Sequence, residues 1–455
     1  MKKVILSLVV ALTSLTINYA QDITGQWNGV LKVQGIQLRL VFNIRETETG
    51  LSATMDSPDQ GAKGIPTTTI SFENTTLKIT IANAHIEYEG TLGKDDIIVG
   101  TFKQNGMVIP LNLSKAVIEK TELVRPQEPK EPFPYYAEDV IFENKMAGIR
   151  LAGTLTLPEK EGVFPVVILI SGSGPQNRNE ELMGHKPFLV ISDYLTKNGI
   201  AVLRYDDRGT AQSKGDFKTA TSADFATDVE SAIAYLNTRK EINKKKIGLV
   251  GHSEGGLIAP MVASKSNKVA FIILLAGTGV SGDKILLAQQ KLIGSASGID
   301  NSTLAKNEEL NRGAFEIIKK SNNPDQLKTD LKKYLQNHAS ESEISSSVNQ
   351  LTSPWMINFI KYDPRASLEK VKCPVLALNG EKDLQVPPKE NLEAIKSALT
   401  KGGNKKVTTL ELPNLNHLFQ ECKTGSPNEY ATIEQTFSPA ALKVMLEWIQ
   451  VQAKQ

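Results

Sequence analysis

Cysteine is scarce in this sequence, which holds only Cys373 and Cys422 among its 455 residues. Two thiols are too few for a disulfide scaffold or for a cysteine-rich zinc site. The charge is also nearly balanced, with a formal net charge of +2. Because binding to nucleic acid or to an anionic membrane surface usually needs a basic excess, the composition favours neither kind of partner.

Long apolar runs are missing as well, except near the first residue. Lys2 and Lys3 precede an apolar run over residues 4–16, and Ala20 offers a small residue before a cleavage site. This pattern is typical of a secretory signal peptide over residues 1–20, since the run is shorter than the roughly 20 residues of a membrane helix. We therefore expect export to the periplasm or the extracellular space, with no membrane span after signal removal.

Residues 21–118 show an alternation of apolar and polar side chains that predicts β-strands. The alternation is clear at residues 37–42 and 77–81, and short turns with Gly or Asn separate such runs. Short strands at this spacing indicate a small all-β barrel or sandwich, which we interpret as an accessory domain. Four prolines mixed with charged residues then predict a stiff linker over residues 119–137.

From residue 138 to residue 455 the pattern changes to apolar strands that alternate with amphipathic helices. Runs rich in Val, Ile and Leu, such as those at 166–170 and 247–250, predict a mostly parallel sheet covered by helices on both faces. A mostly polar, helical stretch interrupts this alternation and is too long to be a loop. We expect residues 280–368 to form a helical cap at the catalytic edge of the sheet.

The sequence Gly-His-Ser-Glu-Gly at residues 251–255 matches the pattern G-x-S-x-G. It follows a predicted strand and precedes a predicted helix, which is the placement that a nucleophile elbow needs. The first turn of that helix would direct free backbone amides at the reacting carbonyl oxygen. Ser253 is therefore the predicted nucleophile, and the alternative is an ordinary glycine-rich turn between a strand and a helix.

A serine hydroxyl becomes an effective nucleophile only when a base removes its proton. In folds with this elbow the chain order is Ser, then acid, then His, and only His338 and His417 follow Ser253. His338 falls in the polar cap, whereas His417 follows the last predicted strand, so His417 is the predicted base rather than an ordinary loop histidine. Asp383, just past another predicted strand, is the predicted acid that orients it, with Glu381 as the alternative.

An oxyanion hole needs two backbone amides. One is predicted to come from Glu254, which follows the nucleophile, and the other from the turn at residues 171–175, where we choose Ser173. A plain tight turn is the alternative for Ser173. A dinucleotide-binding loop is not favoured, because Asn177 stands where G-x-G-x-x-G needs a glycine.

Two further features concern structure rather than chemistry. Arg178 and the run at residues 205–209 could bind a substrate carboxylate, but we expect them to brace loops through internal ion pairs. Cys373 starts a predicted strand, at the sheet edge away from the active site, whereas Cys422 lies past His417, near the active-site edge. A strand of about 7 residues separates these two edges by about 20 Å. A disulfide needs Cα atoms within about 7 Å, so two free thiols are predicted.

Residues 138–455 resemble the α/β-hydrolases, nearest to the branch that mixes serine aminopeptidase-like and esterase members. The segments behind this resemblance are residues 172–178, 204–209, 251–255, 379–383 and 415–420. The resemblance implies an α/β-hydrolase fold with a helical cap. Ser171 differs from the histidine that relatives usually have at the first position of the oxyanion motif.

These residues together predict a serine hydrolase that cleaves carboxylic esters of small molecules through an acyl-enzyme, without a metal or an organic cofactor. The alternative is a serine peptidase or aminopeptidase that acts on short peptides. Its substrates' free amine could bind acidic residues of the cap, namely Glu308, Glu309, Glu341 and Glu343. A third possibility is a binding module that reuses the hydrolase fold.

Overall fold

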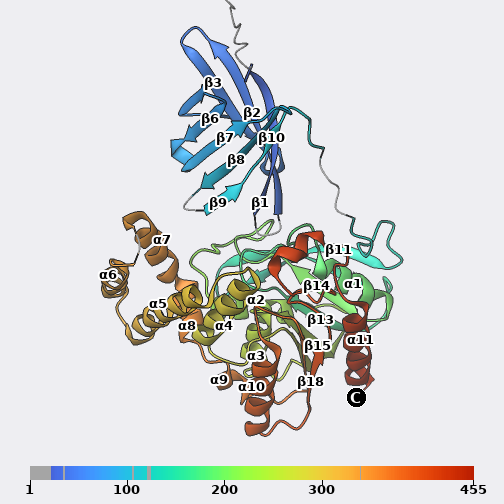
Figure 1. Ribbon diagram of the computed structural model, residues 1–455. Helices are drawn as coiled ribbons and strands as arrows, with labels where there is room; N and C mark the ends of the chain where they lie inside the picture. The colour runs from blue at the N-terminus through green and yellow to red at the C-terminus, as the bar shows by residue number, and fades with distance from the viewer. Residues whose placement is uncertain (1–21, 34–35, 105–106, 120–123, 339, 455) are drawn as a thin grey trace, which may run out of the picture. The chain divides into compact units, whose positions relative to one another are not determined.

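The computed structural model describes residues 22–33, 36–104, 107–119, 124–338 and 340–454 (Figure 1). The predicted signal peptide at residues 1–20 lies outside this part of the chain. The chain divides into two compact units, Met1–Glu122 and Leu123–Gln455. None of the helices within the described ranges combines the length and the apolar character that a membrane crossing would require.

The first unit is one ten-stranded sheet in the order β4-β3-β2-β1-β10-β8-β7-β6-β5, with β9 paired to β8. Every pairing in it is antiparallel, and the sheet is curved (Figure 1). Its strands are β1 (Gly25–Val33), β2 (Ile36–Thr47), β3 (Gly50–Ser57), β4 (Ala62–Pro66), β5 (Thr69–Glu73), β6 (Thr76–Ile81), β7 (Ile86–Leu92), β8 (Ile97–Gln104), β9 (Met107–Pro110) and β10 (Leu113–Ser114).

The alternation in the sequence decides which face of this sheet is buried. Successive side chains of a strand point to opposite faces, and in β7 buried and exposed residues alternate along the whole strand. The buried face includes Trp27, Phe42 and Tyr88, each no more than 1% exposed. Trp27 also donates its indole N–H to the carbonyl of Ile23 at 2.7 Å, which satisfies its one polar atom.

The second unit contains an eight-stranded mixed sheet in the order β11-β12-β14-β13-β15-β16-β17-β18. The pairings of β11 with β12 and of β12 with β14 are antiparallel, and the remaining five are parallel. The strands are β11 (Tyr136–Asn144), β12 (Ile149–Leu157), β13 (Phe164–Ile170), β14 (Ala201–Tyr205), β15 (Ile242–His252), β16 (Phe271–Leu275), β17 (Val375–Gly380) and β18 (Val407–Leu412). The predicted mostly parallel sheet is confirmed.

Helices cover both faces of this sheet, and two separate apolar clusters mark the two faces. One cluster joins the sheet to α2 (Ser222–Leu236), α3 (Gly255–Ala263) and α10 (Pro388–Lys401). The other joins it to α1 (Pro187–Lys197) and α11 (Pro439–Lys454). Parallel strands buried on both sides explain why their sequences are continuous Val, Ile and Leu runs.

A helical insertion separates β16 from β17. It consists of α4 (Gly282–Ala296), α5 (Asn301–Lys320), α6 (Pro324–Leu335), α7 (Glu341–Leu351), α8 (Pro354–Lys361) and α9 (Arg365–Leu368) (Figure 1). Residues of α4 to α8 form an apolar cluster of their own, which includes Phe315, Ile318 and Leu331. The insertion therefore matches the helical stretch expected at residues 280–368.

The proline-rich segment is bonded to the second unit. Arg125 donates hydrogen bonds to the carbonyl groups of Gly184 at 3.1 Å and Ile433 at 2.8 Å. Gln127 donates its side-chain amide to the carbonyl of Phe437 at 2.7 Å. This part of the segment expected to be a linker thus contributes to the surface of the second unit.

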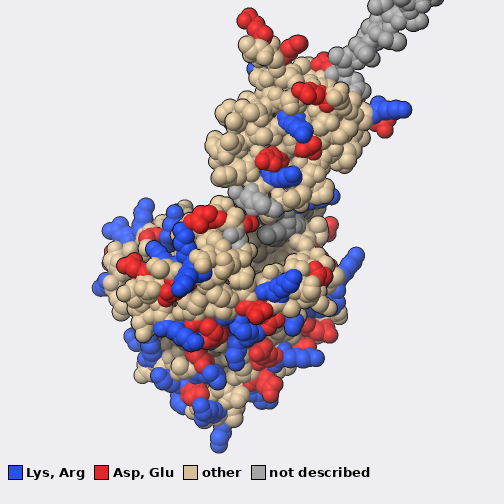
Figure 2. All heavy atoms as spheres, turned by 60° about the vertical axis from the view of Figure 1, so that its left-hand side comes forward, with Lys and Arg blue, Asp and Glu red and all other residues tan. Residues whose placement is uncertain are grey.

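Charges of both signs are mixed over the second unit on the face that Figure 2 shows. Such mixing agrees with the formal net charge of +2.

Both cysteines are free, as predicted. Burial raises the pKa of the Cys373 thiol to about 12 and also raises the pKa of Cys422, so both remain protonated at neutral pH.

Buried ion pairs brace the loops that follow β14, as expected for Arg178 and residues 205–209. Arg178 contacts Asp206 through two hydrogen bonds of 3.1 and 2.8 Å. Arg208 contacts both oxygens of Asp228 at 2.7 and 2.8 Å, and Asp228 also accepts a bond from Asn144. Bidentate pairs of this kind fix both the position and the orientation of the guanidinium group.

We predict that Asp228→Ala destabilises the second unit by about 3–5 kcal/mol, because it leaves the guanidinium of Arg208 buried without its counter-charge. Urea unfolding followed by circular dichroism measures this loss. Asp363→Ala is the matched control, since Asp363 pairs with Arg365 at the surface and its loss should cost much less. Equal midpoints for the two variants would contradict the prediction.

Candidate active site

Ser253 lies in a sharp turn between β15 and α3. Its φ angle of 53° is in the left-handed region, which non-glycine residues rarely adopt, and its N–H donates to the carbonyl of Leu275 at 2.8 Å. The glycines of the motif are needed for close packing. A Cβ atom at Gly251 would lie 2.0 Å from the carbonyl oxygen of Gly255, a distance that no real side chain occupies. The local sequence therefore permits a turn that a larger residue at position 251 would prevent.

His417 and Asp383 form a buried pair in the loops that follow β18 and β17. Nδ1 of His417 lies 2.8 Å from Oδ2 of Asp383, and the two residues are 4% and 2% exposed. The other oxygen, Oδ1, accepts the backbone N–H groups of Gln385 at 2.8 Å and Val386 at 2.9 Å. The carboxylate is thus held on both sides, and its position fixes the orientation of the imidazole ring.

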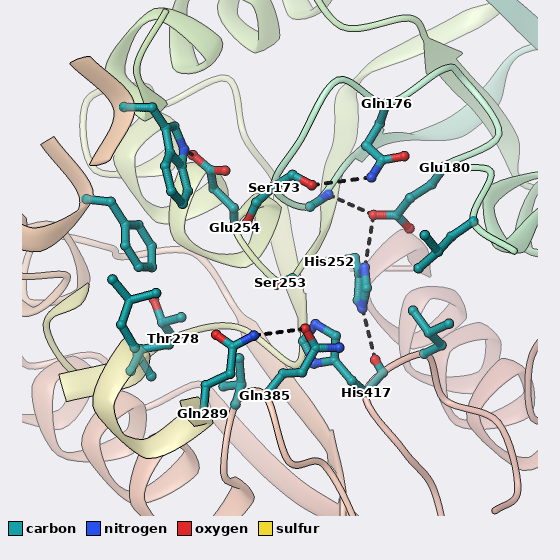
Figure 3. Close-up of a pocket in the computed structure, with 18 residues that line it drawn as sticks. Ser173, Gln176, Glu180, His252, Ser253, Glu254, Thr278, Gln289, Gln385 and His417 are labelled. Atoms are coloured by element: carbon teal, nitrogen blue, oxygen red, sulfur yellow. Dashed lines mark hydrogen bonds and ion pairs between the residues drawn. The ribbon is translucent and has the colours of Figure 1, made fainter. Parts of the chain in front are cut away.

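Ser253 and His417 line the same cavity, which has a volume of about 310 Å³ (Figure 3). Asp383 lies behind His417. The apolar wall of the cavity comes from Leu182, Ile285, Leu286, Trp355, Phe359, Val386 and Leu418, and three amide side chains, Gln176, Gln289 and Gln385, also reach it. The helical insertion therefore contributes to the site through α4 and α8.

The structure also brings Ser173 and Glu254 to this cavity. Within the described part of the chain, the backbone N–H of neither residue donates a hydrogen bond. The neighbouring N–H of Gly172, in contrast, donates to Oε1 of Glu180 at 2.7 Å. Ser173 and Glu254 can therefore offer two free amides to a ligand oxygen, while Gly172 cannot.

The side chain of Glu254 connects the elbow to two helices. Its Oε1 accepts the hydroxyl of Ser222 at 2.5 Å and the indole N–H of Trp355 at 2.8 Å. Burial raises the pKa of Glu254, and hydrogen bonds from Ser222, Trp355 and Ser173 oppose that rise. Because Ser222 belongs to α2 and Trp355 to α8, this carboxyl group joins the helical insertion to the turn that contains Ser253.

A second buried carboxyl group holds the loop that contains Ser173. Asp207 is hydrogen bonded to the hydroxyl of Ser171 at 2.7 Å and to the backbone N–H of Gln176 at 3.0 Å. Burial raises the pKa of Asp207 to about 8, although both hydrogen bonds act in the opposite direction. Ser171, the departure from the family pattern, thus forms a bond that anchors the loop.

The sequence did not single out two residues of this site, His252 and Glu180. Nδ1 of His252 lies 2.9 Å from Oε1 of Glu180, and Nε2 lies 3.0 Å from the carbonyl oxygen of His417 (Figure 3). His252 occupies a variable position of G-x-S-x-G, and a histidine beside the nucleophile was the available signal. Glu180 lies in an irregular loop, where no pattern could have identified it.

The cap glutamates that could have bound the free amine of a peptide do not line the cavity in the described part of the chain. The four are Glu308, Glu309, Glu341 and Glu343. Glu308 and Glu341 each form an ion pair with a basic residue, and Glu343 accepts the backbone N–H of Ser340. Polar helical sequence alone could not reveal which acids face the cavity.

Among the described residues, no group of three or more His, Cys, Asp or Glu side chains is arranged to hold a metal ion.

Comparisons with known proteins agree with a hydrolase. Residues 147–418 match the family model described as X-Pro dipeptidyl-peptidase (S15 family). Esterase EstD of Thermotoga maritima is 26% identical over 289 residues, which are 63% of this chain and 62% of EstD. The chain thus matches about three fifths of that relative's length.

Solved structures with a similar chain course include two hydrolases. The α/β hydrolase GrgF from Penicillium sp. sh18 has a TM-score of 0.46 at 15% identity, covering 70% of this chain and all of GrgF (100%). The esterase Pf2001 of Pyrococcus furiosus has a TM-score of 0.43 at 16% identity, covering 70% of this chain and 94% of that one.

The raised pKa of Asp207 predicts a pH-dependent stability. Between its usual value of 3.8 and about 8, folded Asp207 keeps a proton that the unfolded chain has released, so its contribution to stability falls as pH rises. Asp207→Asn mimics the protonated form and removes this effect. Relative to the parent, the variant should gain up to about 1.4 kcal/mol per pH unit between about pH 5 and pH 8 in urea unfolding. A difference that stays constant with pH would contradict this.

Proposed function

The chain belongs to the X-Pro dipeptidyl-peptidase family (S15), and from that premise we propose that it is a serine hydrolase that cleaves carboxylic esters through an acyl-enzyme. The main support is the 2.8 Å contact between His417 and Asp383, beside a cavity that Ser253 also lines. A nucleophile, a base and an acid that orients the base are the three parts that this reaction requires.

In the proposed mechanism Oγ of Ser253 attacks the ester carbonyl while Nε2 of His417 accepts its proton. Asp383 stabilises the resulting imidazolium through Nδ1, and the amides of Ser173 and Glu254 bind the oxyanion. His417 then donates the proton to the departing alcohol. Water attacks the acyl-enzyme with His417 as base, which releases the carboxylic acid and restores Ser253.

The walls of the cavity favour an uncharged acyl group. Two carboxyl groups are among the described residues that line the cavity, and both are already engaged: Glu180 with Gly172 and His252, Glu254 with Ser222 and Trp355. A free substrate ammonium would have to compete with these hydrogen bonds. The remaining walls are mostly apolar or amide side chains, which suit a neutral acyl chain.

A peptidase is the second candidate function, and the description of the matched family model favours it. The same nucleophile, base and oxyanion amides would serve amide cleavage, with His417 protonating the departing amine. The name of EstD, in contrast, is that of an esterase. The two candidates differ in the leaving group and in the need to bind a free amine.

We predict that Asp383→Asn lowers kcat for ester hydrolysis by about 10⁴-fold. The amides of Gln385 and Val386 will retain the oxygen of the new side chain, so its NH₂ group faces Nδ1 of His417. That contact selects the tautomer with a proton on Nε2, which cannot act as a base. Stopped-flow or steady-state assays with p-nitrophenyl butyrate measure the loss.

Glu381→Gln is the matched control for this variant, because within the described ranges its side chain accepts only the backbone N–H of Asn414 and lies outside the cavity lining. It should retain kcat within about twofold of the parent, as surface substitutions usually do. Ser253→Ala should abolish turnover. Unchanged hydrolysis by Ser253→Ala, or an equal loss in Asp383→Asn and Glu381→Gln, would overturn the proposed function.

The substrate preference is tested by turnover of two sets of chromogenic compounds. We expect p-nitrophenyl acetate and butyrate to be hydrolysed with a higher kcat/KM than alanine p-nitroanilide or alanyl-proline p-nitroanilide, because the cavity has no unengaged carboxylate among its described residues. Faster turnover of either anilide would make the peptidase the better assignment.

A further inference from the structure

His252 lies between the turn at Gly172 and the loop of His417, and the proposed reaction requires a fixed distance between these two segments. Its ring is 6% exposed and packs 4.9 Å from the ring of His417, centroid to centroid. On one side Nδ1 contacts Oε1 of Glu180 at 2.9 Å, and on the other Nε2 contacts the backbone carbonyl of His417 at 3.0 Å. Oε1 of Glu180 also accepts the N–H of Gly172 at 2.7 Å. One continuous chain of hydrogen bonds therefore joins the Gly172 turn to the loop of the proposed base.

The chemistry of these contacts determines where the protons lie. A carbonyl oxygen can only accept, so Nε2 of His252 must be protonated to bond to the carbonyl of His417. If Nδ1 were bare, its lone pair would face the carboxylate of Glu180. A proton therefore lies between Nδ1 of His252 and Oε1 of Glu180, and the N–H of Gly172, which bonds to the same oxygen, favours an imidazolium facing a carboxylate. Burial works against this charged form, but the charge and hydrogen bond of Glu180 outweigh it and raise the pKa of His252.

The backbone at Glu180 gives an independent sign that its position matters. Its φ angle of 50° lies in the left-handed region, although it is neither glycine nor asparagine, and the residue is 5% exposed. Strained backbone of this kind is unfavourable and persists only where the surroundings enforce it. The strained loop directs a carboxylate into the interior, where it meets one amide and one imidazole.

We propose that Glu180 and His252 act as a pair of positioning residues, which hold the oxyanion turn and the His417 loop at the spacing that acyl transfer needs. The proposal rests on the proposed function of the site. Neither residue is assigned contact with the reacting atoms. Their effect is on the geometry of the transition state, so they should change kcat much more than KM.

Glu180→Gln tests the pair with almost no change in shape. A neutral glutamine cannot offset a buried imidazolium, so His252 must lose one proton. The amide atom that replaces Oε1 can then either accept from Gly172 as an oxygen or donate to Nδ1 of His252 as an NH₂ group, so one bond of the chain is lost. We expect kcat for p-nitrophenyl butyrate to fall by about 10- to 100-fold, with KM within about threefold of the parent. His252→Gln should show a similar split between kcat and KM.

A double-mutant cycle separates a coupled pair from two independent structural residues. If Glu180 and His252 act through one chain of bonds, the Glu180→Gln/His252→Gln variant should lose no more activity than the worse single variant. A loss equal to the product of the two single losses would overturn the proposal. So would parental kcat in Glu180→Gln, or losses that appear only in KM. Thermal unfolding checks that each variant is folded at the assay temperature, and a variant that is not folded is replaced in the cycle by its aspartate or asparagine counterpart.

Glu181→Gln is the matched control, because Glu181 is the exposed neighbour of Glu180 and, among the residues that the structure describes, its side chain bonds only to Asn177. Its kinetics should equal those of the parent. Ser253→Ala, measured in the same assay, distinguishes a failure of the positioning pair from a failure of the proposed function. Loss of turnover in Ser253→Ala together with parental kcat in Glu180→Gln would reject the positioning pair and keep the proposed function, whereas turnover in Ser253→Ala would reject the proposed function itself.

Discussion

The carboxylate of Asp383 is the constraint on which the geometry of the site depends. Two backbone amides hold one of its oxygens, and the other oxygen meets Nδ1 of His417. The amides at Gln385 and Val386 belong to the turn after β17, so the position of the imidazole is fixed by main chain rather than by mobile side chains. The parallel pairing of β17 with β18 then brings the His417 loop to the same sheet edge.

Besides Asp383, three buried carboxyl groups lie near the turn that contains Ser253, and each holds a different part of the site in place. Glu180 bonds to Gly172 and His252, Asp207 fixes the turn that contains Ser173, and Glu254 bonds to α2 and to the cap helix α8. Burial of a carboxyl group is costly unless hydrogen bonds or a counter-charge compensate it. Here hydrogen bonds to other loops and helices compensate the burial of these carboxyl groups. The rest of the cavity wall consists mostly of apolar and amide side chains.

The fold of the second unit could be predicted well because the central strands of its sheet are buried on both faces. The apolar run expected at residues 246–250 lies within β15, and the strand expected before Asp383 is β17. The order of the first unit's strands could not be predicted, since β10 pairs between β1 and β8 through long-range register that alternation does not encode. Local pattern determines that a strand forms, whereas tertiary packing determines which strand lies beside it.

The same distinction applies to the site. Ser253, Asp383 and His417 could be proposed from the sequence because a motif, a chain order and strand ends restrict the candidates, and the structure places them around one cavity or directly behind it. Glu180 had no such signal, since a loop residue reaches the site only through tertiary structure. The role of the cap glutamates stayed open for the same reason, because the sequence of an amphipathic helix does not tell which of its acids face a cavity.

The central claim is that the hydroxyl of Ser253 is activated as a nucleophile in this setting. The most direct measurement is reaction of the folded protein with a fluorophosphonate, followed by mass spectrometry of its proteolytic peptides. The account predicts a single stoichiometric phosphonyl adduct on Ser253, which heat denaturation before labelling prevents. The absence of an adduct on the folded protein, or an adduct on a different residue, would contradict it.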